Sequence, residues 1–228
     1  MRSITIEDIE TIRTKSVWDL GNDILYEMCE KYPGHDEDNE IIAKIWLIGR
    51  SYAAAIERRK RLQINDVYEN DDFYEKVVVP TMQNKGSNGI DSLLASINTD
   101  SAGTAKTIEI HKDLMDMFSS ITGLDKRSLA SKYLHFHKRN NFFIYDSRAC
   151  QSISKLVPRI SKIESIQTSK CDIEYRDFVR RCIWLRDKVN EVHGVILTPR
   201  EIDNLLLMIS KERIEGGQND RKTRMARL

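Results

Sequence analysis

A glycine turn between two predicted helices, followed by a lone aspartate at the start of a third, constrains this chain more than any other feature. The apolar spacing predicts a helix over residues 105–120 and a second helix directly after the turn at 122–124. Gly123 suits that turn because glycine adopts a positive φ angle without a Cβ penalty. The apolar run 142–145 then ends on Asp146, and the residues that follow it have helical spacing. This order predicts three consecutive helices, with Asp146 as the N-cap of the last.

The turn has the features of a phosphate site. The first N–H groups of the second helix have no partner within the helix, and the positive end of the helix dipole lies there. Asp125 opposes a phosphate by its charge, but aspartate is a preferred N-cap. The alternative is a turn that only reverses the chain, as most glycine turns between helices do. We expect phosphate contacts from the turn and the first helical residues: Thr122, Gly123, Leu124, Lys126, Arg127 and Ser128.

Asp146 has a chemical interpretation beside its structural one. As a cap alone it stabilises the helix by about 1 kcal/mol. A carboxylate held ionised by helix N–H groups also suits the cleavage of a bond between a base and a sugar, because positive charge builds up on the sugar ring. A fixed carboxylate stabilises that charge and orients an attacking water. Both interpretations stay open on the sequence alone.

Two segments carry a resemblance to a known family. Residues 126–131 look like the second helix of the hairpin in the adenine-excising branch of the helix-hairpin-helix DNA glycosylases, and residues 143–146 are similar to that branch's Phe-Pro-Ile-Leu-Asp. Ser128 and Asp146 are 18 positions apart (146 − 128), which matches the spacing of that branch. Two further strings, 49–59 and 131–137, resemble a group of bacterial proteins similar to 8-oxoguanine glycosylases.

The resemblance implies an all-α fold in which two helical subdomains flank a DNA-binding cleft, with the helix-hairpin-helix motif at its mouth. We expect an N-terminal helical part over 1–100, the hairpin-containing part over 101–215 and a basic flexible tail over 216–228. It also implies a DNA glycosylase that flips a damaged or modified base out of double-stranded DNA and excises it. Asp146 is then the essential carboxylate.

The chain departs from the family at two places. The usual Leu-Pro-Gly-Val-Gly hairpin reads Ile-Thr-Gly-Leu-Asp here, and the nucleophilic lysine of bifunctional members is replaced by Ser128 or Arg127, depending on the branch. This favours a monofunctional enzyme that leaves an abasic site. Lys132 lies one helical turn after Ser128, so its amine is expected to reach the place of that lysine and makes a second catalytic candidate. A contact of Lys132 with phosphate or solvent is the alternative.

Further helices are predicted over 18–31, 39–62, 172–193 and 198–215, the last beginning with a Thr-Pro-Arg-Glu capping box. Residues 77–79 fit a short strand or part of a helix. Arg50 and Tyr52 are the candidates for the base pocket, because an aromatic ring stacks on a flipped base. Core packing of Tyr52 and a surface position of Arg50 are the alternative.

Composition sets limits on partners. The 36 basic and 35 acidic residues give a net charge of only +1, which does not suit a nonspecific DNA coat. The four cysteines show no metal-ligand spacing, and the i,i+2 pair His135 and His137 points to different helix faces. We therefore expect no cofactor, no metal cluster and no membrane partner, and a cytoplasmic monomer with double-stranded DNA as its partner.

The substrate base stays open between an oxidised purine in DNA repair and a modified base of phage DNA in antiviral defence. Two other functions remain as alternatives. One is a non-catalytic helix-hairpin-helix DNA-binding protein in which Asp146 is only a cap. The other is a helical adaptor between proteins.

Overall fold

The computed structural model describes residues 2–60, 70–87, 89–98 and 101–211, and these are mainly helical with no strand among them. The all-α prediction is therefore confirmed. The final helix covers residues 199–211 as described, and the other elements in chain order are α1 (Ile6–Arg13), α2 (Asp19–Lys31), α3 (Asp38–Ser51), α4 (Asn70–Phe73), the π-helix η1 (Tyr74–Val78), α5 (Val79–Met82), α6 (Ile90–Ala95), α7 (Ala105–Thr122), α8 (Arg127–His137), α9 (Ser147–Leu156), the 3-10 turn η2 (Ile160–Lys162) and α10 (Ile173–His193).

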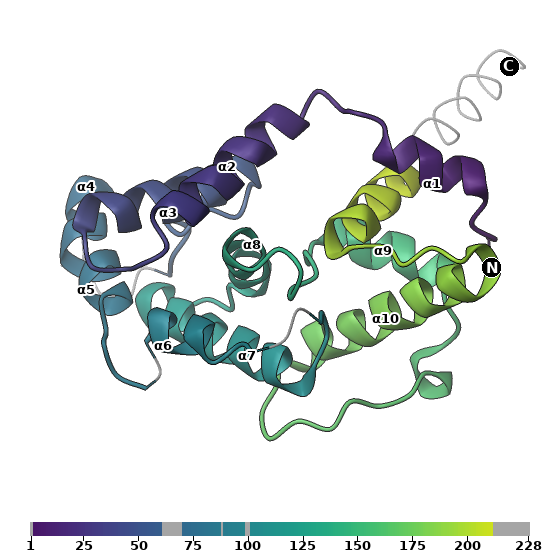
Figure 1. Ribbon diagram of the computed structural model, residues 1–228. Coiled ribbons are helices and arrows are strands. Elements are labelled where there is room, and N and C mark those ends of the chain that lie inside the picture. The colour runs from purple at the N-terminus through teal and green to yellow at the C-terminus, as the bar shows by residue number, and fades with distance from the viewer. Residues whose placement is uncertain (1, 61–69, 88, 99–100, 212–228) are drawn as a thin grey trace, which may run out of the picture.

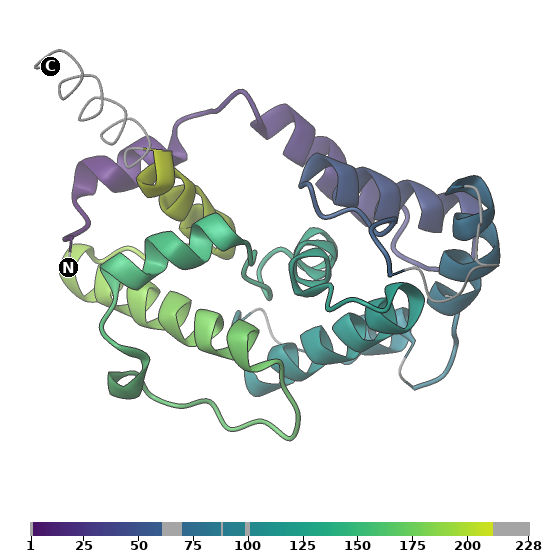
Figure 2. The same cartoon turned by 180° about the vertical axis from the view of Figure 1, so that it is seen from behind.

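Two hydrophobic cores form, with α8 between the elements that build them (Figures 1 and 2). The first core contains α2, α3, α5, α6 and most of the apolar face of α7, together with one face of α8. The second contains α1, α9, α10 and the final helix. The extended run 142–145 joins them, because Phe142 is buried in the first core and Phe143 in the second. Consecutive side chains of an extended segment point to opposite sides, so one short run serves both cores.

Helix α1 packs against the final helix. Ile9 and Ile12 of α1 are buried in the second core, and Arg13 forms an ion pair with Glu201 of the final helix at 2.6 Å. The boundary near residue 100 stays a prediction, and the predicted basic tail 216–228 lies outside the described residues.

Most predicted helices appear where local capping chemistry indicates them. Asp146 and Asp172 cap α9 and α10 by accepting the backbone N–H three residues on. Gly123 and Gly194 end α7 and α10 in the left-handed region, with φ of 67° and 69°. The Thr198 capping box of the final helix is also present, since its hydroxyl and the Glu201 carboxylate each accept the other's backbone N–H.

The long helix predicted over 39–62 is wrong in its second half, because α3 ends at Ser51. Ala53 adopts φ of 51°, and the N–H of Ala54 turns back to the carbonyl of Gly49 at 2.8 Å. The Ala55 Cα lies only 3.3 Å from where a Cβ of Gly49 would stand, so glycine allows the chain to fold back on the helix. Residues 77–79 belong to η1 and α5, so the helical alternative is confirmed there and the strand is wrong.

Four histidines, of which His35, His111 and His135 are buried and His137 is half-buried, are held neutral. Burial lowers the pKa of His35, His111 and His135 to about 4 and that of His137 to about 3. Their contacts suit the neutral ring: Nδ1–H of His135 donates to the Phe142 carbonyl at 2.8 Å, while its Nε2 accepts from the Tyr26 hydroxyl at 2.6 Å. For His35, burial and the Lys44 charge lower the pKa by more than the nearby Asp91 carboxylate raises it.

These histidines predict a loss of stability in mild acid. An unfolded histidine has a pKa of about 6.5, so below that pH the unfolded chain binds more protons than the folded one. Between pH 7.5 and 5 a single histidine with a folded pKa of about 4 removes about 2 kcal/mol of unfolding free energy. His111→Phe keeps an aromatic ring against Tyr175 and should lower the pH dependence of urea unfolding by about that amount. An unchanged pH dependence in this variant would contradict the assignment.

Candidate active site

α8 carries Lys132 into the space between the two cores. The side chain is only 2% exposed. Its amine donates to the Ser128 hydroxyl at 2.7 Å and lies 3.5 Å from the Tyr52 carbonyl. Burial lowers the pKa of Lys132, while the charges of nearby carboxylates oppose that shift. The Lys132 amine thus reaches Ser128, and its catalytic role stays a prediction beside the alternative of a contact with phosphate or solvent.

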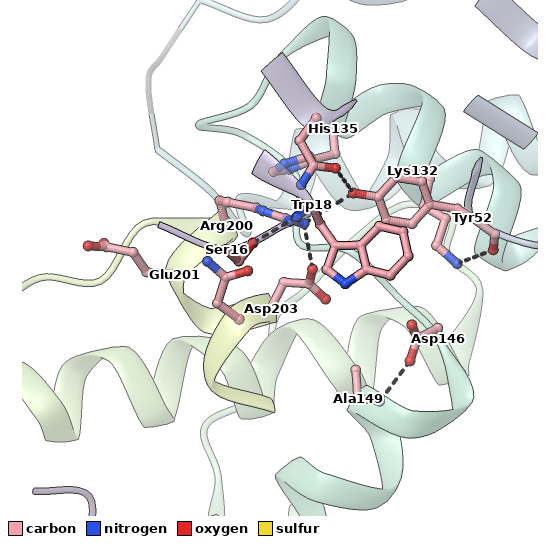
Figure 3. Close-up of polar contacts among 12 residues, drawn as sticks. Ser16, Trp18, Tyr52, Lys132, His135, Asp146, Ala149, Arg200, Glu201 and Asp203 are labelled. Carbon is pink, nitrogen blue, oxygen red and sulfur yellow. Dashed lines mark hydrogen bonds and ion pairs between the residues drawn. The ribbon is translucent and has the colours of Figure 1, made fainter. Parts of the chain in front are cut away.

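Asp146 lies close to this amine because the chain before it is fixed to α8. The Ser131 hydroxyl accepts the backbone N–H of Tyr145 at 3.0 Å, which holds the residue before Asp146 against the residue before Lys132. The Asp146 carboxylate caps α9 by accepting the N–H of Ala149 at 2.7 Å (Figure 3). Its negative charge acts on Lys132, so the two candidate catalytic groups are electrostatically coupled.

Two residues of the final helix complete the cluster, and sequence reasoning missed both. Asp203 is 2% exposed, and its Oδ2 accepts from Arg200 at 2.8 Å. Burial raises the pKa of Asp203 to about 6, the charge of Arg200 opposes this, and the charge of Asp146 adds to it. The available signal was the pair Arg200 and Asp203 at i,i+3 in the first turns of the final helix, but such a pair usually lies on a solvated face.

Tyr52 connects the two cores at this cluster. Its hydroxyl accepts from Arg200 at 3.1 Å and donates to Asn22 Oδ1 at 2.6 Å, and the Lys132 amine lies 5.5 Å from its ring centroid (Figure 3). The structure therefore places Tyr52 beside Lys132. Arg50, the other base-pocket candidate, instead forms an ion pair with Glu57, its Nε lying 2.9 Å from Oε1, and its side chain is 54% exposed.

The hairpin turn is built as expected but capped differently. Thr122 is buried, and its hydroxyl donates to the Phe118 carbonyl at 2.7 Å and accepts the N–H of Leu124 at 3.2 Å. The N-cap of α8 is Lys126, so the expected cap role of Asp125 is wrong. No side chain among the described residues caps α8, which leaves its first backbone N–H groups available to an anion.

The basic side chains of the hairpin turn inward. Lys126 donates to the Ala55 carbonyl at 2.9 Å, and burial lowers its pKa to about 8. Arg127 lies 2.8 Å from Asp172 and 2.9 Å from Glu174, so it ties α8 to α10. Its hydrogen bonds with Asp172 raise the pKa of Arg127. A phosphate would compete with these partners, and the phosphate roles of the six hairpin residues stay predictions.

The described residues contain no group of three or more metal-ligating side chains, and no helix among them is long and apolar enough to cross a membrane. The histidines of the predicted i,i+2 pair do face apart, since His135 contacts Tyr26 while His137 stacks on His35. No family model, no curated protein and no solved structure matches this chain.

The ion pair in the cluster gives a stability prediction. Arg200→Gln leaves the buried Asp203 carboxylate without its cation, which should cost about 3 kcal/mol of unfolding free energy at pH 8. The cost should shrink at pH 5, because a carboxyl group with a pKa of about 6 or more is then mostly protonated.

Chemical denaturation of Arg200→Gln and of the double variant with Asp203→Asn measures this effect, and the double variant should recover much of the loss. Arg13→Gln is the matched control, since it breaks the exposed pair with Glu201 on the same helix and should cost less than about 1 kcal/mol. Equal losses in Arg200→Gln and Arg13→Gln would show that Asp203 does not need its partner.

Proposed function

We propose that the protein is a DNA N-glycosylase and that the Lys132–Asp146 pair is the centre of its active site. The observation that carries the proposal is a desolvated amine coupled to a helix-capping carboxylate between the two cores. Perturbed ionisable groups of this kind gather at functional sites, because a buried charged cluster stabilises a fold poorly. The spacing of Ser128 and Asp146 and the glycine turn before α8 support the same family of reactions.

Asp146 acts on the sugar in this proposal. Cleavage of the C1′–N bond sends the bonding electrons to the base, which leaves with a proton, and positive charge develops on the sugar ring. The Asp146 carboxylate stabilises that charge and orients a water whose oxygen bonds to C1′. The product is an abasic site. Excision by water agrees with Ser128 standing where bifunctional relatives of the resembled family carry lysine.

DNA is held in this proposal by the helix-hairpin-helix motif, α7, the Gly123 turn and α8. Phosphate then binds mainly to the free N–H groups at the start of α8, because the Lys126 and Arg127 side chains have internal partners. The same contacts weaken the alternative of a non-catalytic DNA binder, since its affinity depends on free cations. The excised base is a damaged or modified one, in repair or in defence against phage DNA.

Asp146→Asn tests the reaction. Asparagine keeps the N-cap on α9, so the variant should still fold, although it loses the charge that acts on Lys132, while base release falls by about a hundredfold or more. Abasic sites are scored by alkaline cleavage of duplexes carrying oxidised, alkylated, mispaired or hypermodified bases. Thr5→Ala removes a cap on α1 and should lower stability without changing release. Release at the wild-type rate by Asp146→Asn would exclude this mechanism.

Lys132 has a separate test. With water as the nucleophile, strands should break only after alkali, and borohydride should trap no covalent adduct. A trapped adduct that disappears in Lys132→Gln but persists in Lys188→Gln, a surface lysine on α10, would make Lys132 the nucleophile instead. The lowered pKa of Lys132 makes such a Schiff base chemically feasible, so the experiment separates two real mechanisms.

A further inference from the structure

Two buried polar atoms beside the candidate site have no hydrogen-bond partner in the part of the chain that the structure describes: Nδ2 of Asn22 and Oδ1 of Asp203. A buried polar group without a partner destabilises the fold, so native proteins rarely keep one without a function or a bound group. Each side chain uses its other polar atom in one network, because Asn22 Oδ1 accepts from Tyr52 and Asp203 Oδ2 accepts from Arg200. Tyr52 and Arg200 bond to each other at 3.1 Å. The network thus holds one free donor and one free acceptor.

The other unpaired buried atoms among the described residues have local explanations. Glu57 and Tyr74 interact with each other, and the rings of His111 and His137 are stacked on Tyr175 and His35. Asn22 and Asp203 differ from these atoms because they belong to the network of Tyr52 and Arg200 at the candidate site. The charges of Lys132 and Asp146 act on Asp203.

An exposed aromatic ring lies at the same place. Trp18 is 70% exposed and stands one helical turn before Asn22, on the same face of α2. In the view of the close-up, its indole is drawn over Tyr52 and beside Asp203 (Figure 3). Its neighbour Asp19 is affected by the charge of Arg200, which agrees with that position. A large flat apolar surface beside unpaired polar atoms suits a planar heteroaromatic ligand.

We propose that Trp18, Asn22 and Asp203 form the recognition site for a flipped base, and that this base presents a lactam edge, a C=O group next to an N–H group. The Asn22 amide donates to the carbonyl, Asp203 Oδ1 accepts the N–H, and the base stacks on the indole of Trp18. The inference rests on the proposed function for the flipping of the base, but binding itself does not require excision.

Binding in an Asp146→Asn background tests this site without base release. The probes are duplexes that carry hypoxanthine or unsubstituted purine at one position, since these two bases differ only in the lactam group. The hypoxanthine duplex should bind about tenfold tighter. It should also quench tryptophan emission, and Trp18→Phe should remove that quenching while the affinity stays, which assigns it to Trp18 rather than to Trp46 or Trp184.

Three variants then separate the parts of the site. Trp18→Ala should weaken hypoxanthine binding by about 5- to 100-fold. Asp203→Asn should remove the preference for hypoxanthine, because Arg200 holds the amide oxygen and the NH₂ group then faces the N–H of the base. Asn22→Leu should have the same effect by removing the donor. Leu20→Ala is the matched control, a side chain of α2 that is 73% exposed and has no role in the site.

The outcomes separate this inference from the proposed function. Equal binding of the two duplexes, or equal behaviour of Trp18→Ala and Leu20→Ala, overturns the recognition site even if wild type excises bases through Asp146. Lactam-dependent quenching with no base released by wild type supports the recognition site and overturns the glycosylase.

Discussion

The burial of the Lys132 amine between two hydrophobic cores is the constraint on which the rest of the site depends. Removing an ammonium group from water costs several kcal/mol, and the cost is offset only where acceptors and carboxylates surround it. Ser128 and Tyr52 supply oxygen atoms from the first-core side, while Asp146 and Asp203 supply negative charge from elements of the second core. Both sets of groups reach the amine because α8 lies between the two cores.

Several contacts hold α8 in that position along its whole length. Arg127 at its start pairs with Asp172 of α10, and Ser131 in its middle accepts the N–H of Tyr145. Near its end the neutral ring of His135 bridges the Phe142 carbonyl and the Tyr26 hydroxyl. These contacts link α8 to α10, to α2 and at two points to the run 142–145, so the distance between Lys132 and Asp146 does not depend on a single interaction. A catalytic pair needs this kind of redundancy, since small displacements of reacting groups reduce rates strongly.

The sequence predicted the local parts of this arrangement and missed the long-range ones. The cap at Asp146, the turn at Gly123 and the reach of Lys132 to Ser128 each depend on residues within one or two helical turns, where spacing determines geometry. Lys126 turns inward because its amine donates to the Ala55 carbonyl, 71 residues away. Asp203 acts on Lys132 from the final helix, which is also distant in the sequence. The end of α3 at Ser51 depends on close packing of Ala55 against Gly49, which helical periodicity does not reveal.

The Lys126 and Arg127 side chains bind protein groups, so in the proposed function most of the affinity for DNA has to come from other groups. With Lys126 and Arg127 bound to protein groups, the described hairpin residues offer phosphate mainly the backbone N–H groups at the start of α8. Such contacts position a duplex but give limited affinity for undamaged DNA. The energy of recognition then has to arise where the flipped base enters, among the unpaired polar atoms and the exposed ring beside Asp146. In the proposed function, the protein spends little time on ordinary DNA and is retained mainly at a base that fits.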